Sequence, residues 1–313
     1  MIQSEQQKQV DKVLEYIEHN LNEPLQLEKL AKVSTYSAYH FQRIFKQNTG
    51  ETPASYVKRL RLENAAHVLI YERHIPITEV AFMCGFTSLS YFTYAFTNYF
   101  DTSPKKWREG AYLQRFPREY ENSKNSKLHS NNKQAEQHKN TYNKFKWLDL
   151  NRVKTMDLPG CATVNNRSVG PYTEGIPAAW EELYHWSNAR GFIKPDTLMF
   201  GVPRNNPYIT PPDKSQYDCR VQVDESEIST TDQVTTYSFT GGNHVVYEFE
   251  EAVDYSERSL LIECYSELYS YWLPKSGYRY LGNPIELVQI DPVEGSLSVK
   301  SSIKAICLAI EPK

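Results

Sequence analysis

Gln42 and Arg43 are neighbouring side chains whose chemistry is well suited to recognition. A guanidinium group makes paired hydrogen bonds with guanine, and a carboxamide makes the same kind of paired contact with adenine. Tyr39, Ser37 and Ser90 carry hydroxyl groups that can donate hydrogen bonds to phosphates. The sequence contains no evident set of nucleophile, base and orienting group, no metal-ligand cluster and no phosphate-binding loop. We therefore expect a protein that recognises its partners without a cofactor or metal, and not an enzyme.

An internal repeat predicts the elements that present these side chains. Leu27–Val33 lies fifty positions before Ile77–Met83, and Phe41–Lys46 lies 51 positions before Phe92–Thr97. In each copy a short helical pattern is followed by a turn and by a longer helix with an apolar stripe. Gly85 lies in the second turn, where a left-handed backbone is often required, and the one-residue difference falls in this turn region. The pattern is typical of two helix-turn-helix units.

A spacer joins the two copies of the repeat. Pro53–Tyr71 is predicted to form one long helix, with its proline near the start. Two reading helices on such a spacer can enter successive major grooves on one face of a duplex, about 34 Å apart. One chain would then do what usually takes two, so we expect a monomer or a weak dimer. The less favoured alternative is a plain helical bundle.

Length, charge and composition divide the chain into two domains. Residues 1–146 hold 21 Lys and Arg against 15 Asp and Glu, whereas residues 147–313 hold 14 against 23, so the first part better suits a nucleic-acid partner. Residues 119–143 are rich in Asn, Ser, Lys, Gln and His, which predicts a solvated linker. We expect a helical domain at 8–112, a flexible polar linker at 113–146 and a second domain at 147–313.

Two further features of the composition bear on location and redox state. The sequence contains no stretch of about 18 to 20 uninterrupted apolar residues, and its beginning is polar. We therefore expect a cytoplasmic protein with no membrane partner. The cysteines are odd in number and form no C-x-x-C pair, which argues against disulfides and a zinc site. We expect all of them to be buried as small apolar side chains, namely Cys84, Cys161, Cys219, Cys264 and Cys307.

Beyond the linker, short β-type segments alternate with two helical patterns at Ala178–Arg190 and Ser259–Leu273. Trp180–Phe192 is similar to Tyr265–Tyr278 about 85 residues later, and extended segments follow each copy. We expect a multidomain fold, with an all-α first domain and an α+β second domain of two pseudo-symmetric strand-helix-strand modules. The cleft between two such halves is a natural place for a small ligand. The β-type segments are Arg220–Val223, His244–Phe249, Ile285–Ile290 and Ala305–Ile310.

Residues 27–50 and 75–108 resemble the AraC/XylS family of transcription activators. The second segment carries the pattern I-x-x-V-A-x-x-C-G-F-x-S-x-S-Y-F-x-x-x-F-x-x-x-F-x-x-S-P-x-x-W-R. The resemblance implies that side chains of both longer helices face base edges or phosphates, namely Ser37, Tyr39, His40, Gln42 and Arg43 in the first unit and Thr87, Ser88, Ser90, Thr93 and Tyr94 in the second. Basic side chains near helix ends are candidate phosphate contacts, namely Lys46, Lys105, Lys106 and Arg108.

The two reading helices differ in chemistry. The central reading positions of the second helix carry no Arg, Asn or Gln, and offer hydroxyl groups and the ring of Tyr94. We therefore expect the first helix to read bases and the second to grip the DNA backbone and sense its shape.

Residues 150–312 resemble the GyrI-like small-molecule-binding domain, on the evidence of Gly170–Tyr172, Phe200–Pro207, Tyr217–Arg220 and Asn283–Glu286. The resemblance implies that Glu286, buried among aromatic rings, receives cationic or amphipathic compounds. Its apolar neighbours in sequence fit an inward-pointing acid on a strand, and a surface carboxylate is the alternative. The rings expected nearest the cleft are those of Tyr172, Trp180, Tyr208, Phe249, Tyr255, Tyr265, Tyr269 and Trp272.

These features predict a regulator that binds double-stranded promoter DNA through its first domain and senses a small molecule through its second. Activation is the expected sign, and RNA polymerase is a further candidate partner. The ligand must then bind the DNA-competent and incompetent states with different affinities. The alternative is an enzyme, since some GyrI-like proteins hydrolyse small electrophiles, and Glu286 would then act as the general base. Val288 stands where such domains often carry a tyrosine, so the ligand's identity does not carry over.

Overall fold

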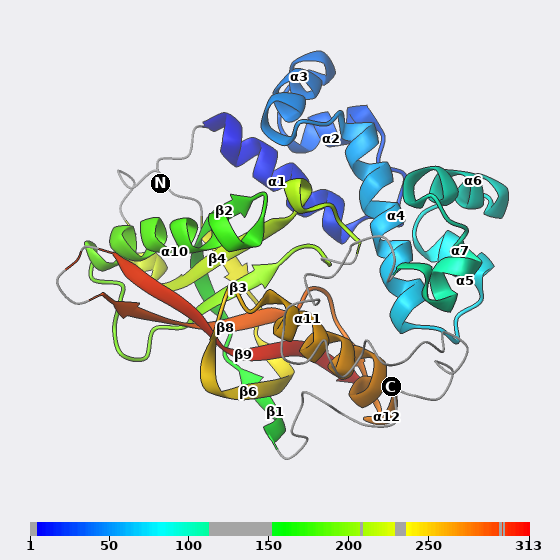
Figure 1. Ribbon diagram of the computed structural model, residues 1–313. Coiled ribbons are helices and arrows are strands. Elements are labelled where there is room, and N and C mark those ends of the chain that lie inside the picture. The colour runs from blue at the N-terminus through cyan, green and yellow to red at the C-terminus, as the bar shows by residue number, and fades with distance from the viewer. Residues whose placement is uncertain (1–4, 113–151, 207–208, 229–235, 294–295, 297) are drawn as a thin grey trace. The chain divides into compact units, whose positions relative to one another are not determined.

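A computed structural model describes residues 5–112, 152–206, 209–228, 236–293, 296 and 298–313 (Figure 1). The predicted linker and Tyr208 therefore lie outside the described residues. The chain divides into two compact units, residues 2–116 and 117–313. The first is helical and the second rich in sheet, which confirms the multidomain prediction. No helix within the described ranges is long and apolar enough to cross a membrane.

The helical unit contains seven α-helices among its described residues. Helix α4 covers Pro53–Tyr71, as the sequence predicts, and a Thr52 hydroxyl caps its first turn. The other helices are α1 (Glu5–His19), α2 (Leu27–Val33), α3 (Ala38–Thr49), α5 (Ile77–Met83), α6 (Leu89–Phe100) and the short α7 (Pro104–Lys106), which runs into a wide turn at Trp107–Ala111.

The predicted repeat is present in the backbone geometry. Helices α2 and α5 have 7 residues each, and α3 and α6 have 12 each. The turn inside each unit contains a left-handed residue, Thr35 with φ 63° and Gly85 with φ 77°. A second left-handed residue ends each longer helix, Gly50 with φ 74° and Asp101 with φ 53°. Because only glycine adopts this conformation without a steric cost, Thr35 holds a more strained backbone than its counterpart.

The repeat extends into the aromatic core. In the first unit the ring of Phe45 lies edge-on to Tyr56 with centroids 5.4 Å apart, and in the second Phe96 lies edge-on to Trp107 at 5.7 Å. Both Tyr56 and Trp107 are fully buried and follow a proline that begins a helix. In each helix-turn-helix unit, a large buried ring from the segment after the reading helix therefore completes the aromatic core.

The sheet-rich unit, residues 117–313, is built on an antiparallel sheet whose strands differ in length. Its strand order is β1-β6-β9-β8-β3-β4-β2-β5, and β7 pairs with β9 outside this order. The strands are β1 (Val153–Leu158), β2 (Cys161–Val169), β3 (Met199–Pro203), β4 (Gln216–Val223), β5 (Thr236–Phe239), β6 (Gly242–Asp254), β7 (Tyr278–Tyr280), β8 (Ile285–Pro292) and β9 (Val299–Pro312). The helices are α10 (Tyr172–Asn188), α11 (Arg258–Glu267) and α12 (Leu273–Lys275).

Both helical predictions in this unit were correct in place and wrong in extent. Helix α10 begins at Tyr172, six residues before the expected start, and contains Pro177 within it. Pro177 is the sixth residue of the helix, so it removes one interior backbone hydrogen bond, that to the Thr173 carbonyl, and the helix continues through it. The second predicted helix is interrupted, because α11 passes into a wide π-type turn at Leu268–Trp272 before α12.

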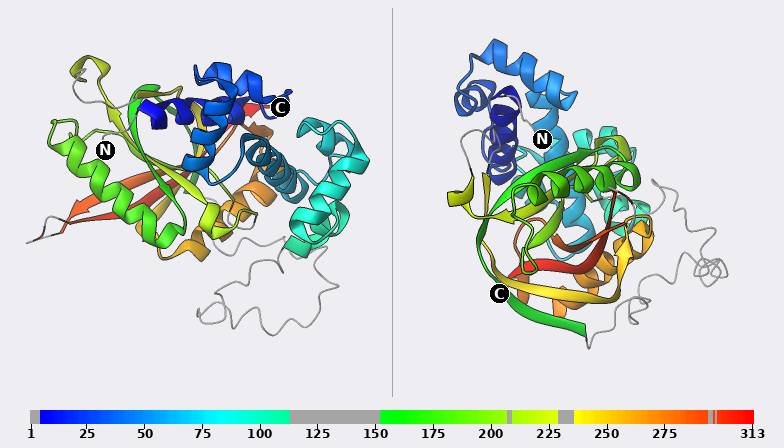
Figure 2. Two further views of the ribbon diagram at one scale, coloured as in Figure 1. Left: turned by 90° about the horizontal axis from the view of Figure 1, so that it is seen from above. Right: turned by 90° about the vertical axis from the view of Figure 1, so that its left-hand side faces the viewer.

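Strand register sets which side chains share a face of the sheet. Gly201 on β3 pairs directly with Cys219 on β4 and with Glu286 on β8. Directly paired residues point to the same face. Helix α10 lies against β2 and β4 (Figure 2), and Asn166, which pairs with Cys219, donates to the Ala179 carbonyl of α10 at 3.0 Å. Glu286 therefore points to the face that α10 covers.

An apolar cluster fills part of the opposite face. Its buried members are Leu158, Phe200, Val202, Val246, Ile285, Ala305 and Cys307. The prediction that all cysteines are buried was wrong for Cys161, which is half-buried near the start of β2, whereas the other four are buried.

Candidate functional sites

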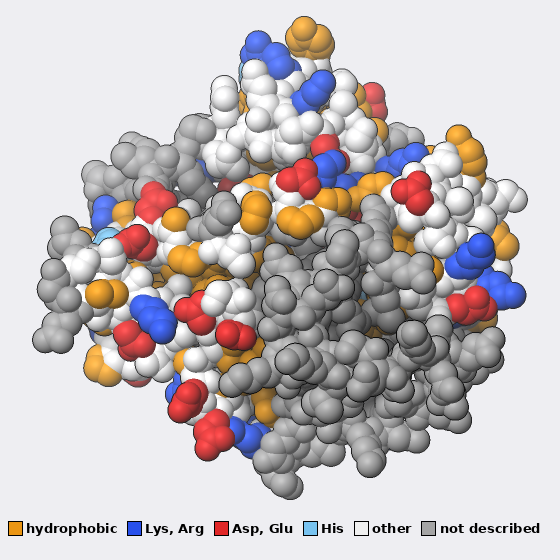
Figure 3. All heavy atoms as spheres, viewed as in Figure 1, with side chains coloured by type: hydrophobic (Ala, Val, Ile, Leu, Met, Phe, Trp, Pro, Cys, Tyr) orange, Lys and Arg blue, Asp and Glu red, His pale blue; other side chains and the backbone are white. Residues whose placement is uncertain are grey.

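Helix α3 presents a polar face to solvent. Phe41, Ile44 and Phe45 are buried, so the positions between them point outward. Tyr39 is 84% exposed, and Gln42 and Arg43 are exposed beside it. Lys and Arg side chains lie next to exposed apolar ones over this helix, at the top of the view in Figure 3. The helix therefore offers paired hydrogen-bond donors and a ring on one outward surface.

The side chains predicted to contact DNA at the start of each reading helix also stabilise the fold of that helix. The Ser37 hydroxyl accepts the His40 backbone N–H at 3.4 Å, and the Ser88 hydroxyl accepts the Tyr91 N–H at 3.2 Å. Both serines are therefore N-caps, which free the hydroxyl hydrogen for a partner outside the helix. The His40 ring is half-buried and lies edge-on to Tyr36 at 4.9 Å, so its position is set by packing within the unit.

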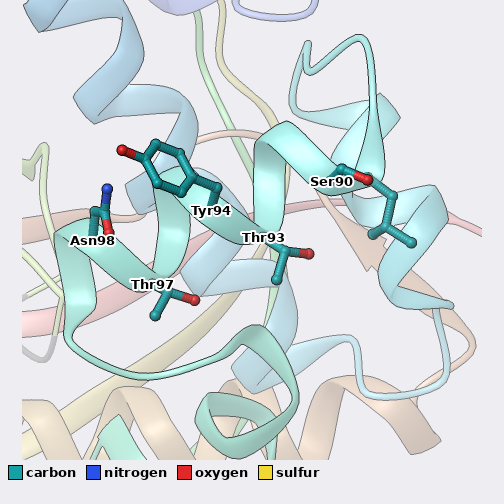
Figure 4. A pocket seen from close by; sticks show the side chains of 6 residues that line it. Ser90, Thr93, Tyr94, Thr97 and Asn98 are labelled. Atoms are coloured by element: carbon teal, nitrogen blue, oxygen red, sulfur yellow. The ribbon is translucent and has the colours of Figure 1, made fainter.

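Helix α6 presents a shallow hollow lined by Leu89, Ser90, Thr93, Tyr94, Thr97 and Asn98 (Figure 4). Ser90, Thr93 and Tyr94 are exposed, as is Thr87 just before the helix, and Tyr94 is 64% exposed. The expectation of hydroxyls and one ring was incomplete, because Asn98 also faces this surface. The signal was its spacing of four and eight residues from Tyr94 and Ser90, which puts all three on one helix face.

The basic candidates near helix ends fall into two groups. Lys46, Lys105 and Lys106 are exposed. Arg108 is half-buried and donates to the Ile75 carbonyl at 2.7 Å, and burial lowers the pKa of its guanidinium. Arg108 therefore holds the loop before α5 in place.

In the second unit, Glu286 is 0% exposed and is the end of a chain of hydrogen bonds. Tyr217 on β4 donates to one carboxylate oxygen at 2.7 Å, and Tyr265 on α11 donates to the other at 2.8 Å. The Tyr217 and Tyr255 hydroxyls lie 2.8 Å apart, and Trp180 of α10 donates its indole N–H to Tyr255 at 2.9 Å. Because each hydroxyl has one hydrogen, the chain runs from Trp180 through Tyr255 and Tyr217 to Glu286.

Burial keeps the phenols of this chain in their neutral, donating form. Tyr217 and Tyr255 are 0% and 1% exposed. Burial, reinforced by the nearby negative charge of Glu286, raises the pKa of both hydroxyls well above the usual value of a tyrosine. Both therefore remain protonated at neutral pH, so that Tyr255 donates to Tyr217 and Tyr217 donates to the carboxylate.

Gly201 makes the approach of Tyr217 to Glu286 possible. It lies directly between Cys219 and Glu286 in the register, and Tyr217 is two residues before Cys219 on the same face. A Cβ atom at Gly201 would overlap the phenol of Tyr217. Because Gly201 on β3 has no side chain, Tyr217 on β4 has the space to reach Glu286 on β8.

A second buried carboxylate, that of Asp218, follows Tyr217 on β4 and points to the opposite face of the sheet. Asp218 is 0% exposed and pairs with Arg167 at 2.6 Å, Arg204 at 2.9 Å and Arg220 at 3.6 Å. Burial alone would raise the pKa of this carboxyl, but the charges of the three guanidinium groups outweigh burial and hold it far below its usual value. This cluster fixes β2, β3 and β4 to one another.

Similarity to known proteins now bears on both sites. A family model for a helix-turn-helix domain matches residues 30–110, and one for a GyrI-like small molecule binding domain matches residues 166–303. The multiple antibiotic resistance protein MarA of Escherichia coli is 39% identical over 99 residues, which are 32% of this chain and 77% of MarA. The chain belongs to the AraC family.

Two further relatives cover the same part of this AraC-family chain. The probable transcription factor PqrA of Proteus vulgaris is 40% identical over 102 residues, which are 32% of this chain and 83% of PqrA. The DNA-binding domain of AdpA, solved in complex with a target DNA, is 28% identical, with a TM-score of 0.32, over 35% of this chain and 96% of that domain. This AraC-family protein is a DNA-binding transcription regulator with a GyrI-like small-molecule-binding domain.

The hydrogen-bond chain of this AraC-family protein includes three of the predicted rings and omits others. Trp180, Tyr255 and Tyr265 belong to it. Tyr172 lies edge-on to Tyr217 at 5.9 Å, and Tyr269 stacks on Tyr265 at 6.5 Å.

The remaining predicted rings contact other partners. Trp272 stacks on Tyr278 at 6.5 Å, and Phe249 is half-buried and edge-on to Tyr247 at 5.2 Å. Trp272 and Phe249 therefore each have a ring partner outside the hydrogen-bond chain.

Sequence reasoning missed Tyr217 as a member of the site, although the segment around it was noted. The only signal was indirect: Tyr217, Gly201 and Glu286 each belong to a segment that resembles the GyrI-like domain. Their contact depends on strand register, which the sequence does not state.

Proposed function

We propose that this chain is a one-component regulator in which helices α3 and α6 read promoter DNA and the Glu286 site receives a cationic or amphipathic effector. The observation that carries the proposal is the buried carboxylate, held by neutral phenols between strands and helices of a GyrI-like domain. The domain limits that go with it are 8–112 for DNA binding, 113–146 for the linker and 147–313 for effector binding.

For DNA, we propose that Gln42 and Arg43 contribute most of the base recognition. An operator can be selected from random-sequence DNA with the full chain, and the binding of variants then measured on it. Arg43→Ala should weaken binding by about 1 to 3 kcal/mol and relax the preference at one base position. Arg73→Ala is the matched control, because Arg73 is exposed in the loop between α4 and α5 and belongs to neither reading helix. Equal affinity and an unchanged selected sequence for Arg43→Ala would refute this assignment.

For the effector, a lipophilic monocation such as tetraphenylphosphonium tests the charge requirement, and triphenylphosphine oxide serves as a neutral analogue. Wild-type protein should bind the cation saturably in calorimetry, and Glu286→Gln should weaken that binding at least about tenfold, because the change removes charge but little volume. Binding of the neutral analogue should change little. If Glu286→Gln binds both probes as the wild type does, the site does not select for charge.

The strand order supports the proposed pseudo-symmetry of the second unit. Starting from the β3–β8 pair, the order continues outward through β4, β2 and β5 on one side and through β9, β6 and β1 on the other. Each side has one long helix, α10 or α11, in the connection before its inner strand. On this proposal Glu286 lies at the junction of the two modules, where a ligand would contact both.

Activation and contact with RNA polymerase are part of the same proposal. A promoter with the selected operator placed upstream should give more transcript in vitro when the protein and effector are both present. A fall in transcript would reverse the proposed sign.

Hydrolysis of small electrophiles is the competing function, since the buried Glu286 and its two tyrosines could also activate water. Turnover of such a compound that is lost in Glu286→Gln would favour the enzyme. Saturable binding without turnover, together with a changed operator affinity, would favour the regulator.

A further inference from the structure

We propose that a buried network on α4 holds the two reading helices at one fixed separation, and so sets the spacing between the two DNA segments that the chain recognises. The inference rests on the proposed DNA reading by α3 and α6. Its members are Glu51, Arg59, Glu63 and Tyr99, which come from the loop after α3, from α4 and from α6.

The network is continuous from one helix-turn-helix unit to the other. Glu51, two residues beyond the end of α3, accepts hydrogen bonds from the Arg59 Nε at 3.0 and 3.1 Å. The Nη1 of the same guanidinium donates to both oxygens of Glu63 at 3.2 Å. Tyr99, on the second reading helix, donates its hydroxyl to Glu63 at 2.9 Å. Four side chains therefore connect the loop after α3 to the last turn of α6.

Burial of the two central side chains makes this connection costly to break. Arg59 is 5% exposed and Glu63 is 6% exposed, and the guanidinium also lies over the Tyr56 ring at 4.8 Å. Burial by itself would lower the pKa of Arg59, but Glu63 and Glu51 outweigh it and raise that pKa, so the arginine keeps its charge. Loss of one partner would leave a buried charge without compensation, which favours the fully connected arrangement over any looser one.

A second connection lies on another side of α4. Arg61 donates to the Leu21 carbonyl at 2.8 Å and to the Glu23 carbonyl, both in the loop before α2. A Cβ atom at Gly85 would meet the Leu21 carbonyl at 2.6 Å and the Arg61 Nε at 2.8 Å. The turn of the second helix-turn-helix unit therefore packs directly against the loop before α2, and the Arg61 side chain contacts both.

A fixed separation has a measurable consequence for DNA recognition. One inserted base pair moves the second site by about 3.4 Å along the duplex axis and turns it by about 35°. A rigid pair of reading helices cannot follow that change, whereas a flexible pair can. Breaking the network should therefore change the preference for one spacing between the two DNA segments more than it changes the affinity for either segment alone.

The test uses the full chain and an operator selected by the wild type, with one base pair inserted or removed between its two contacted segments. The wild type should lose at least about tenfold in affinity on either altered operator, whereas Tyr99→Phe should lose less than about threefold. Both proteins should bind DNA that contains only the first segment equally well, because the first unit is unchanged. Tyr91→Phe, the same chemical change at an exposed position on α6, should behave as the wild type does.

Each outcome decides between the possibilities. An unchanged spacing penalty in Tyr99→Phe would overturn the inference. An equal loss on every DNA, including the single segment, would show a role in folding alone and would also overturn it. Glu63→Gln, which keeps the shape of the side chain, should loosen the spacing preference as Tyr99→Phe does. If the wild type binds the altered operators as well as the selected one, the fixed separation is overturned; if it selects no DNA at all, the proposed reading by two helices fails instead.

Discussion

Gly201→Ala should destabilise the sheet unit, although alanine normally stabilises an unstrained strand position. The backbone of Gly201 is not left-handed, so alanine by itself should gain about 0.4 to 1 kcal/mol through the unfolded chain. The added Cβ would however occupy the space of the Tyr217 phenol. Tyr217 would have to move and would lose its hydrogen bonds to Glu286 and Tyr255.

The size of the effect follows from those two hydrogen bonds. One ends on a charged group and is worth about 1.5 to 3 kcal/mol, and the other joins neutral groups and is worth about 0.5 to 1.5 kcal/mol. After the gain from alanine is subtracted, we expect Gly201→Ala to lower the free energy of unfolding by about 1 to 4 kcal/mol.

A double-mutant cycle in urea, followed by near-ultraviolet circular dichroism of the full chain, isolates the cause. In a Tyr217→Ala background the space is already empty, so adding Gly201→Ala should cost nothing or stabilise by up to about 1 kcal/mol. The two changes should therefore be strongly non-additive. If the cost of Gly201→Ala is the same with and without the tyrosine, the close approach through β3 does not explain why glycine is there.

Four further substitutions test other parts of the structure. Thr35→Gly should raise the free energy of unfolding by about 0.5 to 1 kcal/mol, because it removes the backbone strain of a left-handed threonine. Gly85→Thr should lower that free energy by more than about 2 kcal/mol. Thermal melts measure both effects, and the same sign for both would contradict the repeat. Asn98→Ala should weaken operator binding by about 1 kcal/mol or more in a titration, and no change would remove Asn98 from the interface. Asp218 has a lowered pKa when folded, so its stabilisation is complete above its unfolded pKa of about 4 and is lost as the pH falls through the folded value. Asp218→Asn should therefore cost about 3 to 5 kcal/mol at pH 7, with a difference from wild type that shrinks below about pH 4 in urea unfolding, whereas a constant difference would contradict the ion pairs.

The helical unit could be predicted closely because its signals are local. The apolar stripes and the turn of each copy lie within segments of a few turns, and helix α4 has the predicted limits. The strain at Thr35 was not predicted, because nothing in the residue type announces a left-handed threonine. It becomes visible only when its turn is compared with that of Gly85.

The site in the sheet unit was harder to predict because its parts are distant in the sequence. Tyr217 and Glu286 are 69 positions apart, and Trp180 and Tyr255 are 75 apart. Resemblance to a family identified the acid, but the donor that reaches it depends on the register of β3, β4 and β8. A shift of one residue in any of these pairings would put Tyr217 on the other face, with Asp218 in its place.

The two buried glutamates illustrate how surroundings give the same side chain different roles. Glu63 shares a guanidinium with Glu51, so much of its charge is neutralised within the network, which suits a fixed structural connection. The two tyrosines that donate to Glu286 do so as hydroxyl groups, and their hydrogen bonds reduce the cost of burying the carboxylate. Glu63 is therefore held by a guanidinium and one hydroxyl group, and Glu286 by two hydroxyl groups, so that hydrogen bonds from separate elements compensate each buried carboxylate.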